Sequence, residues 1–215
     1  MLYLLKKPGG KIMPKILLIN GSCREKGNTF IALSEVGKAL NARNVETEML
    51  WIGSGPVQDC VACNRCAELD RCAFDADGVN TVIGMLDSVD GIVVGSPVYY
   101  GGPSGRICSF LDRLFYSSGS RFAGKIGAAV VVCRRGGATA AFDRLNNFFL
   151  MNNMIVPSSQ YWNQVHGAAP GEAALDAEGL QTMRTLGENI SWILECTAGK
   201  EAPRYENRIA TNFIR

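Results

Sequence analysis

The stretch Lys15–Leu40, KILLINGSCREKGNTFIALSEVGKAL, decides the fold. Its apolar run Ile16–Ile19 is short and β-branched at both ends, which is typical of a strand buried on both faces of a sheet. After a polar loop, apolar residues recur every three or four positions and predict the buried face of a helix. These residues are Phe30, Leu33, Val36 and Leu40. A strand, a loop and a helix in this order are the repeating unit of an α/β protein.

The polar loop 20–29 predicts an anion site. Unpaired backbone N–H groups and the helix dipole both point from a helix N-terminus toward whatever precedes it. The loop has glycines only at Gly21 and Gly27, so it matches neither the dinucleotide fingerprint nor the P-loop. Its remaining donors suit a single terminal phosphate, and an ordinary capped loop is the alternative. They are Ser22, Arg24, Asn28 and Thr29.

Four further stretches predict the other strands of one sheet, at 45–52, 91–97, 126–133 and 154–158. The stretch 45–52 alternates in polarity and predicts a more exposed strand. Helical periodicity separates or follows them, at 79–89, 107–115, 140–152 and 178–195. Strands that alternate with helices predict a doubly wound, five-stranded parallel sheet with helices on both faces.

Three unusual loops follow predicted strand ends, at 20–29, 96–105 and 133–139, and therefore fall on one edge of the sheet. The second, SPVYYGGPSG, has paired tyrosines that could stack on a planar ligand, and glycines that let the backbone approach it. The third, CRRGGA, repeats the glycines beside Arg134 and Arg135. A phosphate cradle beside a ring platform predicts a phosphorylated planar cofactor, which a mononucleotide flavin fits better than a nucleotide base.

A compact cysteine motif, CVACNRCAELDRC, follows the second predicted strand with the spacing C-x2-C-x2-C-x5-C. Three thiolates this close can bind three corners of one [4Fe–4S] cube, and the last cysteine could bind the fourth. Structural zinc usually takes two separated C-x2-C pairs, and no second pair exists in the sequence. The alternatives are thiols without a metal, and zinc. The candidate ligands are Cys60, Cys63, Cys66 and Cys72.

Composition excludes several classes of protein. The net charge is +2 with acidic and basic residues mixed, so we expect no nucleic-acid surface. No apolar stretch approaches the length of a membrane span. With no export signal in the sequence we expect a cytoplasmic protein, where eight cysteines are not a disulfide framework.

One domain is expected at 15–198, with a cysteine-rich insertion at 54–77 and a C-terminal tail at 199–215. Residues 1–14 are predicted to be an N-terminal extension. Met13 stands directly before the first strand, so residues 1–12 are either a surface arm or not native.

The motifs GSCREKGNT, GSPVYYGGPSGRICSFLDR and CRRGGATAAFDRLNNFFLMNNMIVPSSQYWNQVHG resemble the NADPH-dependent FMN reductase and iron–sulfur flavoprotein family. The resemblance runs from about Lys15 to Leu194 and implies a flavodoxin-like sheet with strand order 2-1-3-4-5. It also implies bound FMN. Around the phosphate it places Ser22, Arg24, Gly27, Asn28 and Thr29. Along the ring it places Pro97, Val98, Tyr99, Tyr100 and Gly101, flanked by Arg135, Gly136 and Gly137. Cys23 stands where the family usually has proline.

The implied function is an FMN-dependent oxidoreductase that moves electrons between a donor, NAD(P)H or ferredoxin, and a small acceptor, with a [4Fe–4S] cluster as relay. The family commonly forms homodimers or homotetramers. One alternative is a flavin-only NAD(P)H-dependent reductase of flavins or quinones. Another is a non-enzymatic carrier like flavodoxin, but such carriers tend to be strongly acidic and the pI here is about 8.1. No catalytic side chain is nominated, because flavin itself carries the chemistry.

The sequence also contains a single histidine, an aromatic pair and a charged pair. The only histidine, His166, is expected in a loop. Tyr161 and Trp162 are expected to cover the flavin, to meet a second subunit or simply to pack. Asp112 and Arg113 fall off the apolar stripe of their helix and are expected in surface or interface pairs.

Overall fold

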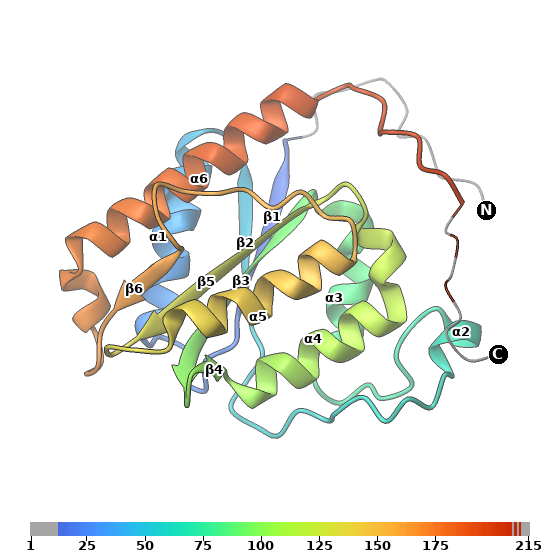
Figure 1. Ribbon diagram of the computed structural model, residues 1–215, viewed down its shortest axis with the longest axis horizontal. Coiled ribbons are helices and arrows are strands. Elements are labelled where there is room, and N and C mark those ends of the chain that lie inside the picture. Colours follow the sequence, from blue (N-terminus) through green and yellow to red (C-terminus); the bar gives the residue numbers. More distant parts are fainter. Residues whose placement is uncertain (1–12, 208, 210, 212–215) are drawn as a thin grey trace.

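A parallel sheet forms the centre of the molecule (Figure 1). The computed structural model describes residues 13–207, 209 and 211, so the predicted N-terminal extension lies almost wholly outside the described residues. The first predicted strand is confirmed as β1 (Lys15–Asn20). Beside it lie β2 (Glu46–Trp51), β3 (Gly91–Tyr99), β5 (Ile126–Cys133) and β6 (Gln164–His166). All of these strands are parallel to their neighbours.

The number and order of the strands differ from the prediction. The sheet has six strands in the order β2-β1-β3-β5-β6, rather than five strands in the order 2-1-3-4-5. The additional strand, β4 (Gly102–Pro103), pairs antiparallel with the end of β3 and stands off the main path. The last strand is β6 rather than 154–158, where Ile155 makes an isolated bridge to Ile126. Pro157 has no N–H group to continue a ladder there.

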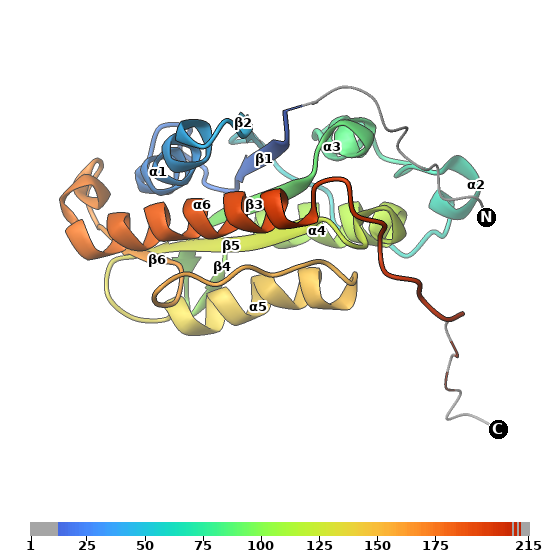
Figure 2. The same ribbon diagram turned by 90° about the horizontal axis from the view of Figure 1, so that it is seen from above.

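Helices cover both faces of the sheet, as predicted (Figure 2). On one face Leu17 and Ile19 pack with α3 (Val79–Met85), α4 (Gly105–Ser118) and α5 (Ala138–Met151). On the other face Ile16 and Leu18 pack with α1 (Asn28–Ala42) and α6 (Ala177–Thr197). The alternating side chains of β1 are therefore buried on both faces, which explains its uninterrupted apolar run.

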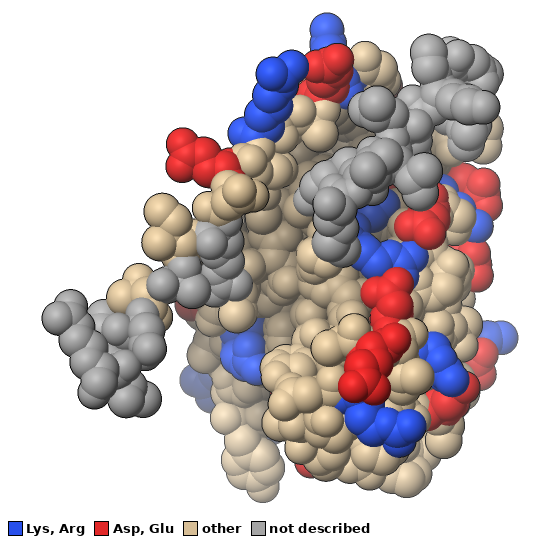
Figure 3. All heavy atoms as spheres, turned by 90° about the vertical axis from the view of Figure 1, so that its right-hand side faces the viewer, with Lys and Arg blue, Asp and Glu red and all other residues tan. Residues whose placement is uncertain are grey.

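The cysteine-rich segment leaves the sheet after β2 and returns at α3, passing along α4 (Figure 1). Its regular structure is one short helix, α2 (Cys66–Leu69). Three 3-10 turns complete the fold, at Leu86–Ser88, Gly119–Phe122 and Glu172–Leu175. On the side of the molecule where α2 lies, acidic and basic side chains are interspersed (Figure 3). Within the described part of the chain, no helix has both the length and the hydropathy to span a membrane.

Asp176 joins the edge strand β6 to the start of α6. One carboxylate oxygen caps the helix by accepting from the Gly179 N–H at 2.9 Å, and the other accepts from the His166 N–H at 2.6 Å. His166 thus lies in β6 rather than in the predicted loop. Burial raises the pKa of Asp176, but these hydrogen bonds and the nearby His166 ring lower that pKa overall, below its ordinary value of 3.8.

We expect Asp176→Asn to lower the free energy of unfolding by about 1 kcal/mol near neutral pH, because the two N–H donors lose a charged acceptor. A carboxylate with a lowered pKa stabilises the fold above the unfolded-state value and loses that effect as the pH falls through the folded-state value. In urea titrations the difference between the wild type and the variant should therefore be full well above pH 3.8 and should shrink progressively as the pH falls below that value.

Asp143→Asn, at an exposed position of α5, is the matched control and should change stability by less than about 0.5 kcal/mol. A difference for Asp176→Asn that stays constant at acidic pH would contradict the assignment.

Candidate functional site

The loop after β1 is held open by its own hydrogen bonds. Asn20 accepts from the Ser22 N–H at 3.1 Å, and the Ser22 hydroxyl accepts from the Arg24 N–H at 3.1 Å. The Trp51 indole donates to the Ser22 carbonyl at 2.8 Å and ties the loop to β2. The loop backbone is therefore positioned without any ligand.

The N-terminus of α1 lacks a side-chain cap. Its first residue follows Gly27, which has no side chain to accept from the first N–H groups. By contrast, Ser104 caps α4 and Asp176 caps α6. Uncapped N–H groups and the helix dipole attract an anion. The start of α1 is therefore suited to bind one, at the loop where the sequence predicts an anion site.

A cavity of about 250 Å³ lies in front of this helix end. The first and second loops contribute Ser22, Arg24, Gly27, Asn28, Thr29, Pro97, Val98 and Tyr99 from the predicted set, together with Cys23. The structure adds Val132, Cys133 and Arg134 at the end of β5, and Gly167 and Ala168 after β6. Gly167 and Ala168 escaped prediction because the last strand was placed too early. The GAAPG run after His166 is the turn signal that could have revealed them.

Asn28 has a role that the sequence did not show. Its side-chain amide donates to the Ala169 carbonyl at 2.9 Å, and its oxygen accepts from the Gly171 N–H at 3.0 Å. The side chain thus fastens the loop after β6 to the start of α1. A ligand in the cavity would meet Asn28 through its backbone.

The second loop is a tight hairpin between β3 and β4. Tyr100 and Gly101 form its two-residue turn, with φ angles of 50° and 78°. Tyr100 is fully exposed at the tip, and neither turn residue lines the cavity. Tyr99 does line it, with its hydroxyl 3.7 Å from the Cys23 sulfur. Burial, and then the contact with Cys23, raise the pKa of Tyr99.

The third loop packs closely on the second at Gly137, beside the Gly101 backbone and the Val98 side chain. Arg134 lines the cavity, whereas Arg135, Gly136 and Gly137 do not. Gly137 has a φ of 89° and precedes α5, which also begins without a side-chain cap. A Cβ atom at Gly137 would lie 2.8 Å from the Gly101 Cα. Glycine is therefore required there by both conformation and space.

All four predicted cysteine ligands line a second pocket, between the 60–74 segment and α4. Cys63 is exposed and Cys72 is buried, with Cys60 and Cys66 between these extremes. A single zinc ion needs four donors at about 2.0–2.3 Å from one point, and the described residues contain no cluster arranged in that way. A [4Fe–4S] cube binds each thiolate to a different iron, so its ligands stand further apart. Four thiols around one pocket are the donor set that such a cube takes, one for each iron.

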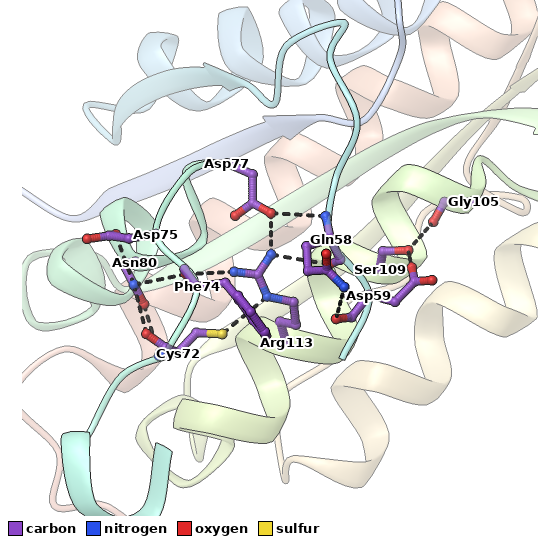
Figure 4. Close-up of polar contacts among 10 residues, drawn as sticks. All are labelled: Gln58, Asp59, Cys72, Phe74, Asp75, Asp77, Asn80, Gly105, Ser109 and Arg113. Atoms are coloured by element: carbon purple, nitrogen blue, oxygen red, sulfur yellow. Dashed lines mark hydrogen bonds and ion pairs between the residues drawn. The ribbon is translucent and has the colours of Figure 1, made fainter. Parts of the chain in front are cut away.

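Arg113 faces this pocket, which corrects the prediction of a surface pair. Its side chain is 1 % exposed and donates to the Cys72 sulfur at 3.2 Å (Figure 4). Its neighbour Asp112 does make a surface pair as expected, with Arg144 at 3.5 Å. Tyr161 and Trp162 are exposed and stack edge to face on each other.

The family model for NADPH-dependent FMN reductases matches residues 14–168, which include the cavity loops and the cysteine motif. The chain belongs to this family. Its FMN-dependent oxidoreductase activity follows from the family. The chain is 33 % identical to an iron-sulfur flavoprotein of Methanocaldococcus jannaschii over 84 % of its own length and 97 % of the relative. It is 28 % identical to an iron-sulfur flavoprotein of Methanosarcina thermophila over 84 % of its length and 95 % of the relative.

The fold resembles that of a flavodoxin-type, WrbA-like protein of Agrobacterium tumefaciens. The TM-score is 0.60 at 15 % identity, over 86 % of this chain and 99 % of the other. The sheet is therefore flavodoxin-like, as the sequence motifs implied.

The glycine contact between the second and third loops gives a testable consequence. We expect Gly137→Ala to destabilise the protein by about 1–3 kcal/mol, because the new Cβ meets the Gly101 backbone and the residue must keep a positive φ. The measurement is the urea midpoint and its slope. Gly136→Ala is the control, since a Cβ there meets nothing within 4 Å, and its midpoint should stay within about 0.5 kcal/mol of the wild type. Equal effects of the two substitutions would contradict the packing described.

Proposed function

We propose that this FMN-dependent oxidoreductase also carries a [4Fe–4S] cluster on Cys60, Cys63, Cys66 and Cys72, and exchanges electrons between that cluster and the flavin. The observation that carries the proposal is that all four cysteines of the compact motif line one pocket. Two relatives that match this chain over nearly their whole length are named iron-sulfur flavoproteins, which supports the proposed cluster. When bound, the cluster supplies single-electron transfer.

The cavity at the edge of the sheet fits FMN. The uncapped start of α1 and the hydroxyls of Ser22 and Thr29 would hold the phosphate, and Arg24 would add charge. The residues Pro97, Val98 and Tyr99 would lie along the ring, with the Tyr100–Gly101 turn and the loop Arg135–Gly137 outside them. FMN, when bound, accepts hydride or single electrons. The chain positions the ring, supplies N–H donors and excludes water.

The electron donor and the oligomeric state are inferred from the family to which the chain belongs. NAD(P)H or a reduced ferredoxin would deliver electrons, and a small molecule would receive them. A homodimer or homotetramer and a cytoplasmic location complete the proposal. The FMN-binding domain would span 15–198, with the cysteine insertion at 54–77 and a tail at 199–215. A flavin-only reductase is the alternative that the experiments below separate.

Thr29→Val tests the phosphate site. Thr29 is buried at the start of α1 and lines the cavity, and valine keeps the shape but removes the donor. Loss of one hydrogen bond to a charged group should raise the Kd for FMN about tenfold, measured by fluorescence quenching with the flavin-free protein.

Riboflavin, which has no phosphate, is the control ligand, and its Kd should not change. Ser34→Ala, further along the same helix, is the control variant. Equal losses for FMN and riboflavin would place the phosphate elsewhere.

Protein purified without oxygen should contain flavin and about four irons and four sulfides per chain. Cys66→Ser should lose the iron and sulfide and keep the flavin, because the flavin cavity contains none of the four ligands. Cys196→Ser removes an exposed cysteine from α6 and should retain both cofactors. Flavin without iron in the wild type, even after reconstitution with iron and sulfide, would favour the flavin-only reductase.

A further inference from the structure

The guanidinium of Arg113 is buried on α4 and directs all of its contacts into the cysteine-rich segment (Figure 4). Its Nε–H donates to the Cys72 sulfur at 3.2 Å. Its other N–H groups donate to the Gln58 carbonyl at 3.2 Å, to the Phe74 carbonyl at 2.7 Å and to the Asp77 carboxylate. The rigid fork of the guanidinium is thus shared between backbone, carboxylate and thiol.

Packing alone does not explain this charge. Burying an Arg–Asp pair costs desolvation, and apolar side chains of similar volume often stabilise a fold equally well. Burial works against the charge of Arg113, but Asp77, and then Cys72, raise its pKa overall, so the guanidinium stays charged. One oxygen of Asp77, Oδ1, is buried without a hydrogen-bond partner among the described residues. Burying this network therefore costs desolvation free energy. One of the contacts that the network makes is the hydrogen bond from Arg113 to Cys72.

Cys72 is also fixed from the backbone side. The Asn80 side chain accepts from the Cys72 N–H at 2.9 Å and donates to the Cys72 carbonyl at 3.0 Å. Cys63, by comparison, is exposed, and the neighbouring residues Ala62 and Asn64 have positive φ angles. Cys72 is therefore the buried corner of the pocket, and Cys63 lies on its exposed side.

We propose that Arg113 is a positioning residue of the cluster site. It holds the Cys72 side chain in its buried orientation and, once a cluster is bound, keeps a hydrogen bond on that ligand sulfur. A donor at a ligand sulfur stabilises the more negative, reduced cluster and so raises its reduction potential. The second part of this inference rests on the proposed function, and the first part does not.

The test of the second part is the midpoint potential of the cluster, followed by electron paramagnetic resonance during anaerobic titration. Arg113→Lys keeps the positive charge but loses the guanidinium fork, and Arg113→Met with Asp77→Asn removes both charges together. Both proteins should have a more negative midpoint potential than the wild type. Arg144→Lys, at a half-exposed arginine that lies over Phe148, should leave the potential unchanged. Unchanged potentials in both Arg113 proteins would overturn the proposal.

The test of the first part uses cluster-free protein and iodoacetamide, with each cysteine quantified by mass spectrometry. In the wild type, Cys63 should react much faster than Cys72. In Arg113→Lys the labelling of Cys72 should rise severalfold, while the buried Cys133 stays protected and reports that the fold is intact. Equal rates at Cys72 in both proteins would overturn the positioning role. If the wild type binds no iron after reconstitution, the proposed cluster fails, and the labelling alone decides whether Arg113 holds Cys72.

Discussion

Close backbone contact between β1 and β3 at the carboxyl edge of the sheet is the constraint on which both sites depend. The Gly21 N–H donates to the Gly95 carbonyl at 2.8 Å, and a Cβ at Gly21 would lie 2.8 Å from the Ile107 side chain. The Ser104 hydroxyl, which caps α4, donates to the Gly21 carbonyl at 2.9 Å. Because these atoms meet with no room for side chains, the phosphate loop, the hairpin and the start of α4 have fixed relative positions.

Helix α4 connects the cavity at the sheet edge to the cysteine pocket. Near its start, Arg106 donates to the Gly55 carbonyl, and in the next turn Ser109 contacts Asp59. Arg113 follows one turn later and contacts Cys72. The segment 54–77 is thus attached to the helix at successive turns, although its sequence has little regular structure. The cysteine pocket is part of the same folded unit as the cavity at the sheet edge, and Ser104 and Arg113 lie about 14 Å apart along the helix axis.

Local patterns predicted the features that depend on local sequence. The unit β1–loop–α1 followed from an apolar run and helical periodicity, and the convergence of three loops followed from parallel strands sharing one edge. The last strand was missed because β6 is three residues long and Val165 is its only buried side chain. Arg113 was misplaced for a different reason. A charged residue off an apolar stripe is usually exposed, and only tertiary contacts with a segment about forty residues earlier provide the partners that make its burial tolerable.

The two sites have one electrostatic principle in common in the proposed enzyme. Reduction adds negative charge to a flavin or a cluster, and a fixed donor nearby makes that charge less costly. At the cavity the donors are backbone N–H groups at the uncapped start of α1, whereas at the pocket the donor is the side chain of Arg113. Donors buried in the protein are screened by salt much less than charges at the surface. A chain with a net charge of only +2 can therefore favour reduced cofactors locally, without the strongly charged surface that long-range attraction would need.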